Sequence, residues 1–246
     1  MSSTRLFSPA PLSANTDVTL TGDQARYIGR VLRLKPGDGF TIFDGTGGEY
    51  LATVATVGKT QVQISTGTLD KRNAESPLAI HLLQGISRGE RMDFVVQKAT
   101  ELGVRRITPV LTEFSVVKLD LKRAKKRAQH WSNIVISACE QCGRNILPVI
   151  DAPQPLRNWF GENLTSADPR ILLRPDANAP LGSISKPQGV VTLLVGPEGG
   201  FSDAEYEQAE IAGFRGIGFG PRILRTETAA IAAIAVLQSL HGDLGH

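Results

Sequence analysis

Short apolar stretches separated by turn residues dominate the first seventy positions of the chain. They predict strands at 40–43, 50–57 and 61–65, with turns at Asp44–Gly48 and Val57–Lys59. Before them, apolar residues recur at helical spacing from Ala25 to Leu32, and Lys35–Asp38 ends this short predicted helix. Three short strands joined by tight turns predict a small β-barrel or meander.

The pattern changes after a polar stretch, residues 69–77, that ends in a proline and is interpreted as a linker. Buried strands and amphipathic helices alternate beyond it, which predicts an α/β domain with a largely parallel sheet. Strands are expected at 78–83, 107–111, 171–173, 190–195 and 216–219. Helices are expected at 91–102, 121–139, 202–212 and 226–240, with a further element at 156–164. The predicted domains are therefore residues 1–72 and 73–246.

The last predicted helix has no polar face between Ala229 and Leu237. A helix that is apolar all round is a buried helix. Because it lies near the end of the chain, it must be covered by its own domain, by a second subunit or by both.

Composition narrows the class of protein. The chain has 246 residues, of which 41% are hydrophobic and 21% charged, so it can bury a core without disulfides. Its net charge of +3 permits a polyanionic partner without requiring one. The first residues form no signal peptide, and no apolar run approaches the length of a membrane span. With only two cysteines, the expected location is the reducing cytoplasm.

Two glycine-bearing loops could bind a ligand. The first is Gly196–Gly200, which leaves a buried strand and precedes a helix opened by Ser202 and Glu205 at capping-box spacing. The second is Gly216–Gly220, which leads through Arg222 and Arg225 to Thr226, a candidate N-cap. Neither loop fits a Walker or a standard dinucleotide motif. The alternatives are tight turns that only pack, arginines that are only solvated, or a nucleotide-dependent oxidoreductase.

Two basic groups suit a phosphate backbone. One has six members between Lys118 and Arg127, including Lys122 and Lys126; the other is Arg26, Arg30 and Arg33. A solvated helix face is the alternative for the first. Cys139 and Cys142 have no second pair, and the four histidines have no ligand spacing, so no metal site is expected.

Several segments taken together resemble the RsmE family of ribosomal RNA methyltransferases. They occur in family order over nearly the whole chain: Gly29–Arg33, Phe43–Gly45, Gln97–Val104, Glu140–Asn145, Gly196–Gly200 and Gly220–Ala229. The resemblance implies a PUA-like RNA-binding domain followed by a SPOUT methyltransferase domain with a C-terminal trefoil knot. It also implies a homodimer that transfers a methyl group from S-adenosylmethionine to N3 of a uridine in 16S rRNA, within the small ribosomal subunit. Neither a metal nor a membrane is expected to take part.

The resemblance also implies site residues. The methyl donor is expected against Leu173, Gly196, Pro197, Gly199, Gly200, Phe219, Gly220, Ile223 and Leu224. Arg225 is expected to stabilise the uracil anion or orient the base, and Glu198 is the candidate general base, with Glu140 and Glu101 as weaker candidates. The expected RNA-binding residues are Arg26, Arg30, Arg33, Lys122, Lys126, Arg144, Asn145 and Arg222. A non-catalytic RNA-binding or assembly factor with the same fold stays open as an alternative.

Overall fold

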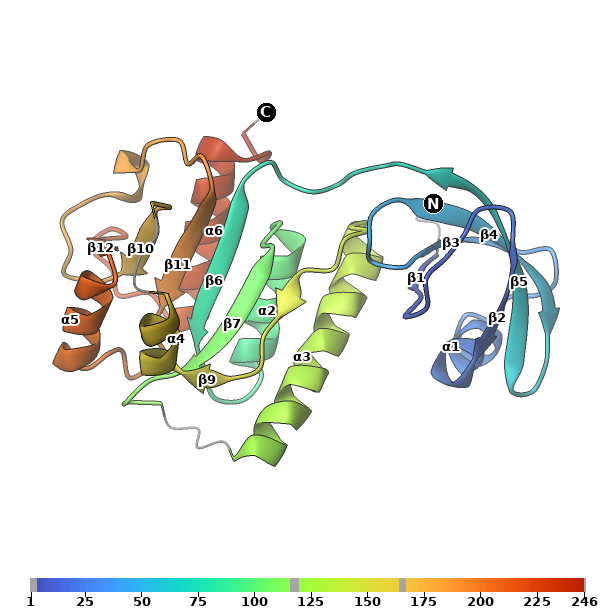
Figure 1. Ribbon diagram of the computed structural model, residues 1–246, viewed down its shortest axis with the longest axis horizontal. Helices are drawn as coiled ribbons and strands as arrows, with labels where there is room; N and C mark the ends of the chain where they lie inside the picture. Colours follow the sequence, from blue (N-terminus) through green and yellow to red (C-terminus); the bar gives the residue numbers. More distant parts are fainter. Residues whose placement is uncertain (1–3, 116–119, 164–166, 246) are drawn as a thin grey trace. The chain divides into compact units, whose positions relative to one another are not determined.

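The computed structural model describes residues 4–115, 120–163 and 167–245 (Figure 1). The chain divides into two compact units. The N-terminal unit combines Met1–Glu75 with Cys139–Leu147, and the C-terminal unit combines Ser76–Ala138 with Pro148–His246. The first break lies close to the boundary expected after residue 72. The return of Cys139–Leu147 to the N-terminal unit has no signal in the sequence, because it begins inside a continuous helix.

The N-terminal unit contains a five-stranded sheet in the order β1-β3-β4-β5-β2. Its strands are β1 (Arg5–Phe7), β2 (Asp17–Thr21), β3 (Gly39–Phe43), β4 (Glu49–Val57) and β5 (Gln61–Asp70). Only β1 and β3 pair in parallel, and register shifts interrupt the pairing of β4 with β5. Residues 69–70 therefore belong to a strand, although the sequence predicts a linker there.

A short helical segment packs against this sheet. It comprises α1 (Gly22–Arg26) and the π-helical η1 (Tyr27–Val31). Ala25 and Ile28 are buried with alternate residues of the strands, among them Phe40 and Ile42, in one apolar core. The predicted helix is therefore present, but it changes hydrogen-bond pattern halfway along.

The C-terminal unit is built on a parallel sheet in the order β12-β10-β11-β6-β7-β8, and β9 also pairs with β7. The strands are β6 (Ala79–Gly85), β7 (Arg106–Leu111), β8 (Val149–Ile150), β9 (Gln154–Pro155), β10 (Arg170–Leu173), β11 (Val190–Val195) and β12 (Phe214–Ile217). The α/β fold class predicted from the alternation of strands and helices is confirmed. The predicted strand at 216–219 ends two residues early, so Gly218 and Phe219 belong to the following loop.

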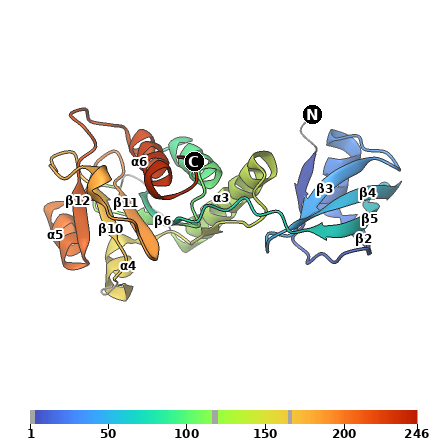
Figure 2. The same ribbon diagram turned by 90° about the horizontal axis from the view of Figure 1, so that it is seen from above.

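Helices cover both faces of this sheet. They are α2 (Arg91–Glu101), α3 (Leu121–Cys142), α4 (Leu156–Glu162), α5 (Asp203–Ile211) and α6 (Thr226–His241), with the short 3-10 helix η2 (Leu181–Ser183). Figures 1 and 2 show α2 and α6 on one face and α4 and α5 on the other. Leu83, Leu172 and Leu194 pack toward α4 and α5, where Trp159 and Phe160 complete an apolar cluster. None of the described helices has the length and apolarity needed to cross a membrane.

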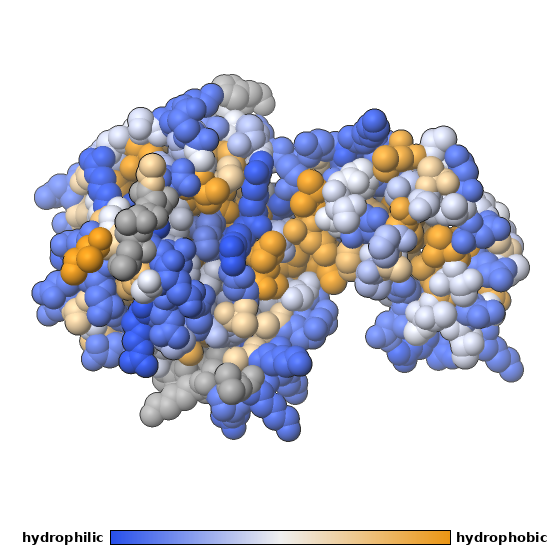
Figure 3. Space-filling model, viewed as in Figure 1, coloured by the Kyte–Doolittle hydropathy of each residue, from blue (hydrophilic) through white to orange (hydrophobic). Residues whose placement is uncertain are grey.

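A buried glutamine fixes the C-terminal helix. Gln238 donates from Nε2 to the carbonyl of Leu102 at 2.8 Å and accepts from the hydroxyl of Ser76 at 2.6 Å. These bonds fix the C-terminal end of α6. The visible face of the C-terminal unit in Figure 3 is largely hydrophilic, with separate hydrophobic spots.

Candidate active site

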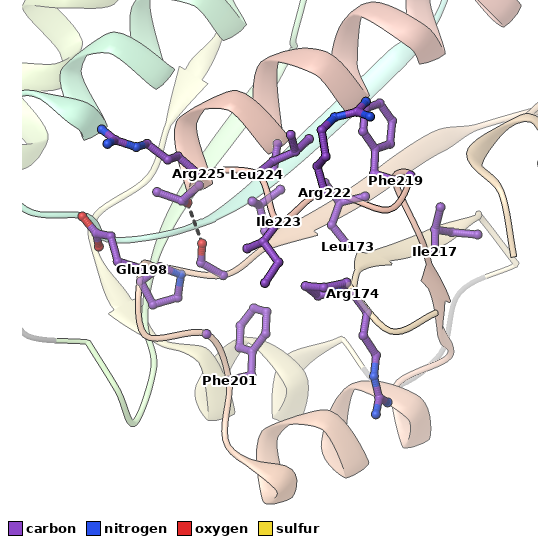
Figure 4. Close-up of a pocket in the computed structure, with 18 of the residues that line it drawn as sticks. Leu173, Arg174, Glu198, Phe201, Ile217, Phe219, Arg222, Ile223, Leu224 and Arg225 are labelled. Atoms are coloured by element: carbon purple, nitrogen blue, oxygen red, sulfur yellow. Dashed lines mark hydrogen bonds between the residues drawn. The ribbon is translucent and has the colours of Figure 1, made fainter. Parts of the chain in front are cut away.

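A cavity of about 440 Å³ lies where strands β10, β11 and β12 end. The loop after β11 and the loop between β12 and α6 both line it (Figure 4). These are the two glycine-bearing loops singled out in the sequence, and the fold brings them to one place. The carboxyl ends of parallel strands are where open α/β sheets bind ligands.

All the residues expected to bind the methyl donor line this cavity except Gly199. A Cβ atom at Gly199 would lie 2.9 Å from the Cβ of Phe114, so this glycine permits close packing of the loop against residues 112–115. Further residues that were not among the expected site residues also line the cavity: Arg91, Arg174, Pro175, Val195, Phe201, Tyr206, Ile217, Thr226 and Ala229.

A chain of side-chain hydrogen bonds joins the first loop to α6. Gln84, which is fully buried, donates to the hydroxyl of Thr226 at 2.9 Å, and Thr226 donates to the carbonyl of Gly196 at 2.6 Å (Figure 4, dashed line). Thr226 is the first residue of α6 and Arg225 is its N-cap, so the expectation that Thr226 caps the helix is wrong. Its hydroxyl instead holds the loop, which no local sequence pattern reveals.

Strand β6 supports the same loop from below. A Cβ atom at Gly85 would lie 2.4 Å from both N and Cδ of Pro197, so only glycine fits at this position. On the other side, Ser202 and Glu205 form the predicted capping box of α5, which is confirmed. The loop Gly196–Gly200 is therefore held at both ends before any ligand binds.

The lining is mainly apolar, with a few polar groups around it. Leu173, Phe201 and Ile223 face the cavity (Figure 4), and Arg174 extends toward α5, where its guanidinium lies 4.5 Å from the ring centre of Tyr206. A volume of this size with apolar walls and accessible backbone groups suits a small cofactor with an aromatic ring. The residues present therefore fit the adenosyl part of S-adenosylmethionine.

Charged residues surround the entrance. Arg222 and Arg225 extend in opposite directions from the second loop, and Glu198 lies on the Arg225 side (Figure 4). Both arginines are exposed, and neither has an ion pair among the residues that the structure describes. They are available to an anionic ligand, as expected for guanidinium groups that bind phosphate.

Glu198, the candidate general base, forms an ion pair with Arg91. Its Oε1 accepts from Nη1 of Arg91 at 2.7 Å and from the backbone N–H of Arg88 at 3.3 Å. Burial raises the pKa of Glu198, but the hydrogen bonds to backbone N–H groups and to Arg91 outweigh it and hold the pKa below the usual range. A carboxylate with a lowered pKa is a weak proton acceptor.

The weaker candidates for the base lie elsewhere. Glu101 pairs with Lys98 on α2, and Glu140 belongs to the N-terminal unit, where its Oε1 accepts from the N–H of Phe7 at 2.9 Å. Burial raises the pKa of Glu140. Neither residue lines the cavity.

Of the residues expected to bind RNA, most are exposed. Arg26, Arg30 and Arg33 lie at the surface of the N-terminal unit, and Lys122 and Lys126 are exposed on α3. Lys118, which belongs to the same basic group as Lys122 and Lys126, lies outside the described residues. These five residues are open to solvent, as contact with a phosphate backbone requires.

Arg144 and Asn145 are the exceptions. Arg144 is 3% exposed and its Nε donates to Glu75 at 2.9 Å, with a second contact from Nη2. Asn145 is fully buried and donates to the carbonyl of Arg72 at 2.6 Å. This placement does not support their expected RNA contacts, because both residues are buried and the guanidinium of Arg144 and the Nδ2 of Asn145 bind within the protein.

Neither of the two cysteines lines the cavity. No group of three or more His, Cys, Asp or Glu within the described ranges could hold a metal ion. Cys139 is buried, and burial raises the pKa of its thiol to about 12, which keeps it protonated. Cys142 is only partly buried.

The chain is similar to known protein families, proteins and solved structures. Residues 74–238 match the RNA methyltransferase domain family, and residues 20–66 match the RNA methyltransferase PUA domain family. The chain is 39% identical to ribosomal RNA small subunit methyltransferase E of Buchnera aphidicola from Schizaphis graminum, over 98% of this chain and 97% of that protein. It is 31% identical to the protein of the same name from Bacillus subtilis, over 92% of each.

Two solved structures are also similar. A ribosomal RNA small subunit methyltransferase E from Neisseria gonorrhoeae, bound to S-adenosylmethionine, has 40% identity and a TM-score of 0.91, over 98% of this chain and 99% of that one. A methyltransferase from Legionella pneumophila, in complex with the same cofactor, has 40% identity and a TM-score of 0.92 with the same coverage.

Proposed function

The chain belongs to the RsmE family of ribosomal RNA small subunit methyltransferases, and from that premise we propose that it methylates N3 of a uridine in 16S rRNA with S-adenosylmethionine as donor. The observation that carries this proposal is that both glycine-bearing loops line the same cavity. The alternative, a non-catalytic RNA-binding or assembly factor, would not need a preformed cavity for a small cofactor. The match of residues 74–238 to an RNA methyltransferase domain family does not support the other alternative, an oxidoreductase.

The cofactor supplies a methyl group already activated by its positive sulfur. The residues of this chain must hold the uridine in line with that methyl group, which is the proximity contribution to catalysis. In the reaction N3 of uracil loses its proton, its electron pair forms the bond to the methyl carbon, and the carbon–sulfur bond breaks. Leu173, Gly196, Gly200 and Leu224 provide the apolar walls and the backbone groups against which the donor would lie.

The anion formed at the uracil needs stabilisation. Arg225 lines the cavity, is exposed, and stands at the N-terminus of α6, where the positive end of the helix dipole adds to its charge. We assign it to stabilise the anion or orient the base. Glu198 is assigned as the proton acceptor, provided that its pairing with Arg91 is loosened by the substrate.

RNA binding is assigned to the exposed basic residues of both units. The N-terminal unit carries Arg26, Arg30 and Arg33, and α3 carries Lys122 and Lys126. The match to a PUA domain family supports this assignment for the N-terminal unit. Arg222, exposed at the cavity entrance, is assigned to the RNA segment that carries the target base. A ribosomal RNA substrate in the small subunit implies that the protein works in the cytoplasm.

A homodimer and a trefoil knot complete the proposal. Ile231, Ala232, Ala235 and Val236 of α6 are only half-buried in one chain, and Leu240 is 46% exposed. A second copy of the chain would cover this apolar surface. Sedimentation of the purified protein at several concentrations tests the dimer: a monomer at all of them would contradict it.

The direct test of the function is methylation of the RNA itself. Small subunits lacking the modification are incubated with donor labelled in its methyl group, and the RNA is digested to nucleosides. We expect the label in 3-methyluridine. Label on a carbon, on a ribose oxygen or on protein would contradict the assigned reaction.

A further inference from the structure

A second hollow, of about 500 Å³, adjoins the donor cavity. It is lined by Arg88, Gly89, Glu90, Arg91 and Glu198. Arg91 and Glu198 also line the donor cavity, so the two spaces meet at this ion pair. A molecule in the second hollow can therefore reach a group held in the first.

The two spaces differ in the residues that line them. Apolar residues predominate around the donor cavity, whereas the side chains around the second hollow are two arginines and two glutamates, which also present apolar atoms to it. Gly89 has φ of +62° and has no atom within 4 Å of the place where a Cβ would lie, so the backbone is open there. Guanidinium groups that surround open backbone are suited to a nucleotide, whose phosphate and base carbonyls are all acceptors.

Arg91 stands between two carboxylates from different elements. Its Nη1 lies 2.7 Å from Oε1 of Glu198 in the first glycine loop, and its Nε lies 4.0 Å from Oε1 of Glu227 in α6. The Arg91 side chain is 42% exposed, while that of Glu227 is 15% exposed. The carboxylate of Glu198 therefore lies at the hollow, and that of Glu227 lies toward the protein interior.

Glu227 depends on Arg91 for its counter-charge. Its Oε2 is buried and has no hydrogen-bond partner among the described residues. A buried carboxylate oxygen without a partner is costly, so a guanidinium that moves toward Glu227 would be stabilised there. Arg91 can thus release Glu198 and remain neutralised by Glu227.

We propose that the second hollow seats the target uridine, with Arg88 toward its phosphate, and that Arg91 moves from Glu198 to a uracil carbonyl oxygen during methyl transfer. This proposal rests on the proposed function and adds Arg91 as a second catalytic cation beside Arg225. Glu227 is a positioning residue, because it acts on the substrate only through Arg91.

The exchange links two requirements of the reaction. When Arg91 contacts the uracil oxygen, the negative charge that develops as N3 loses its proton is stabilised. At the same time Glu198 loses its closest cation, which raises its pKa and makes it a better acceptor for the N3 proton. Arg88 and Glu90, from the segment before α2, line the hollow beside Glu198 and Arg91. Glu227 of α6 lies next to Arg91, and Arg225, the N-cap of α6, lies on the same side of the cavity as Glu198.

The first experiment compares Arg91→Ala with Arg157→Ala, a control at an exposed arginine of α4. Single-turnover methyl transfer is measured on unmodified small subunits, and donor affinity is measured by calorimetry. Because a preorganised charge group is removed, we expect transfer to fall about 100-fold in Arg91→Ala. Donor affinity should stay near the wild-type value, and Arg157→Ala should match wild type in both measurements.

Rescue separates contact with the substrate from a structural role. Arg91→Lys should recover part of the lost rate, and added guanidinium ion should restore part of it in Arg91→Ala. The pH profile gives a second signature: without the cation, the rise of the rate with pH should move upward by about 1 pH unit or more. Glu227→Gln should lower kcat with KM unchanged, while Glu207→Gln, at an exposed position of α5, should have no effect.

Two results would overturn the proposal. One is transfer by Arg91→Ala at the wild-type rate with an unshifted pH profile. The other is loss of donor affinity equal to the loss of transfer, which would place Arg91 in the donor site alone. If wild-type protein itself forms no 3-methyluridine, the proposed function fails instead, so the two failures are distinguishable.

Discussion

Arginines serve opposite purposes in the interior of the N-terminal unit and at the cavity of the C-terminal unit. In the N-terminal unit, Arg144 is buried against Glu75, and Arg5 is paired with Glu49 at 2.7 Å. At the cavity of the C-terminal unit, Arg222 and Arg225 are exposed and have no ion pair among the described residues. The difference teaches that an arginine buried against a carboxylate serves the fold, whereas an exposed arginine without such a partner can meet a ligand directly.

The largest expected effect comes from removing the buried arginine of the N-terminal unit, Arg144. Arg144→Ala leaves the carboxylate of Glu75 buried without its partner, so we expect the protein to lose about 3–5 kcal/mol of stability. Denaturant unfolding followed by fluorescence and circular dichroism measures this loss. Arg157→Ala, at an exposed arginine, is the matched control. An Arg144→Ala protein with unchanged stability and weakened RNA binding would restore the role expected from sequence.

The next effect tests the shape of the donor cavity without changing any charge. In Gly85→Ala the new methyl group would lie 2.4 Å from Pro197 and displace the first glycine loop. Since a misplacement of about 1 Å can cost about 100-fold in rate, we expect methyl transfer to fall by about that factor and donor binding to weaken. Single-turnover kinetics measure the rate, and calorimetry measures donor binding. Gly161→Ala on α4, where a Cβ meets nothing within 4 Å, is the control and should bind donor normally.

Arg225→Ala tests the exposed side of the comparison. Loss of one charge-stabilising group should lower methyl transfer by about 10- to 100-fold, with donor affinity largely intact. Single-turnover kinetics and calorimetry on the same preparation separate the two quantities. A defect confined to donor binding would overturn the assigned role of Arg225.

The smallest expected effects come from single basic residues at the surface. Arg30→Ala or Lys126→Ala removes one phosphate contact at most, so each should weaken RNA binding only slightly and lower its salt dependence by about one counterion. Binding to a 16S rRNA fragment measured at several salt concentrations tests this, with Lys59→Ala as an exposed control. A salt dependence equal to that of wild type in either variant would exclude the residue from the RNA interface.

Much of the architecture could be predicted from local pattern. The spacing of apolar residues indicated α2, α3, α5 and α6 to within a few positions, and Ser202 with Glu205 indicated the capping box. Those features depend on residues close together in sequence, whose periodicity and hydrogen bonds are local. The π-helical turn at Tyr27–Val31 could not be predicted, because five residues are too few for the apolar pattern to distinguish its hydrogen bonding from that of an α-helix.

The sequence by itself determined the fold class, the two loops that form the donor cavity and, through resemblance, the family. Only the tertiary structure decided which charged residues remain available. Arg144 and Asn145 resemble binding residues until the fold brings Glu75 and Arg72 against them. Arg91 attracts no notice in the sequence until the fold places Glu198 and Glu227, more than a hundred residues away, on either side of it. Charge is a property of the residue, but its pairing depends on contacts that are distant in sequence.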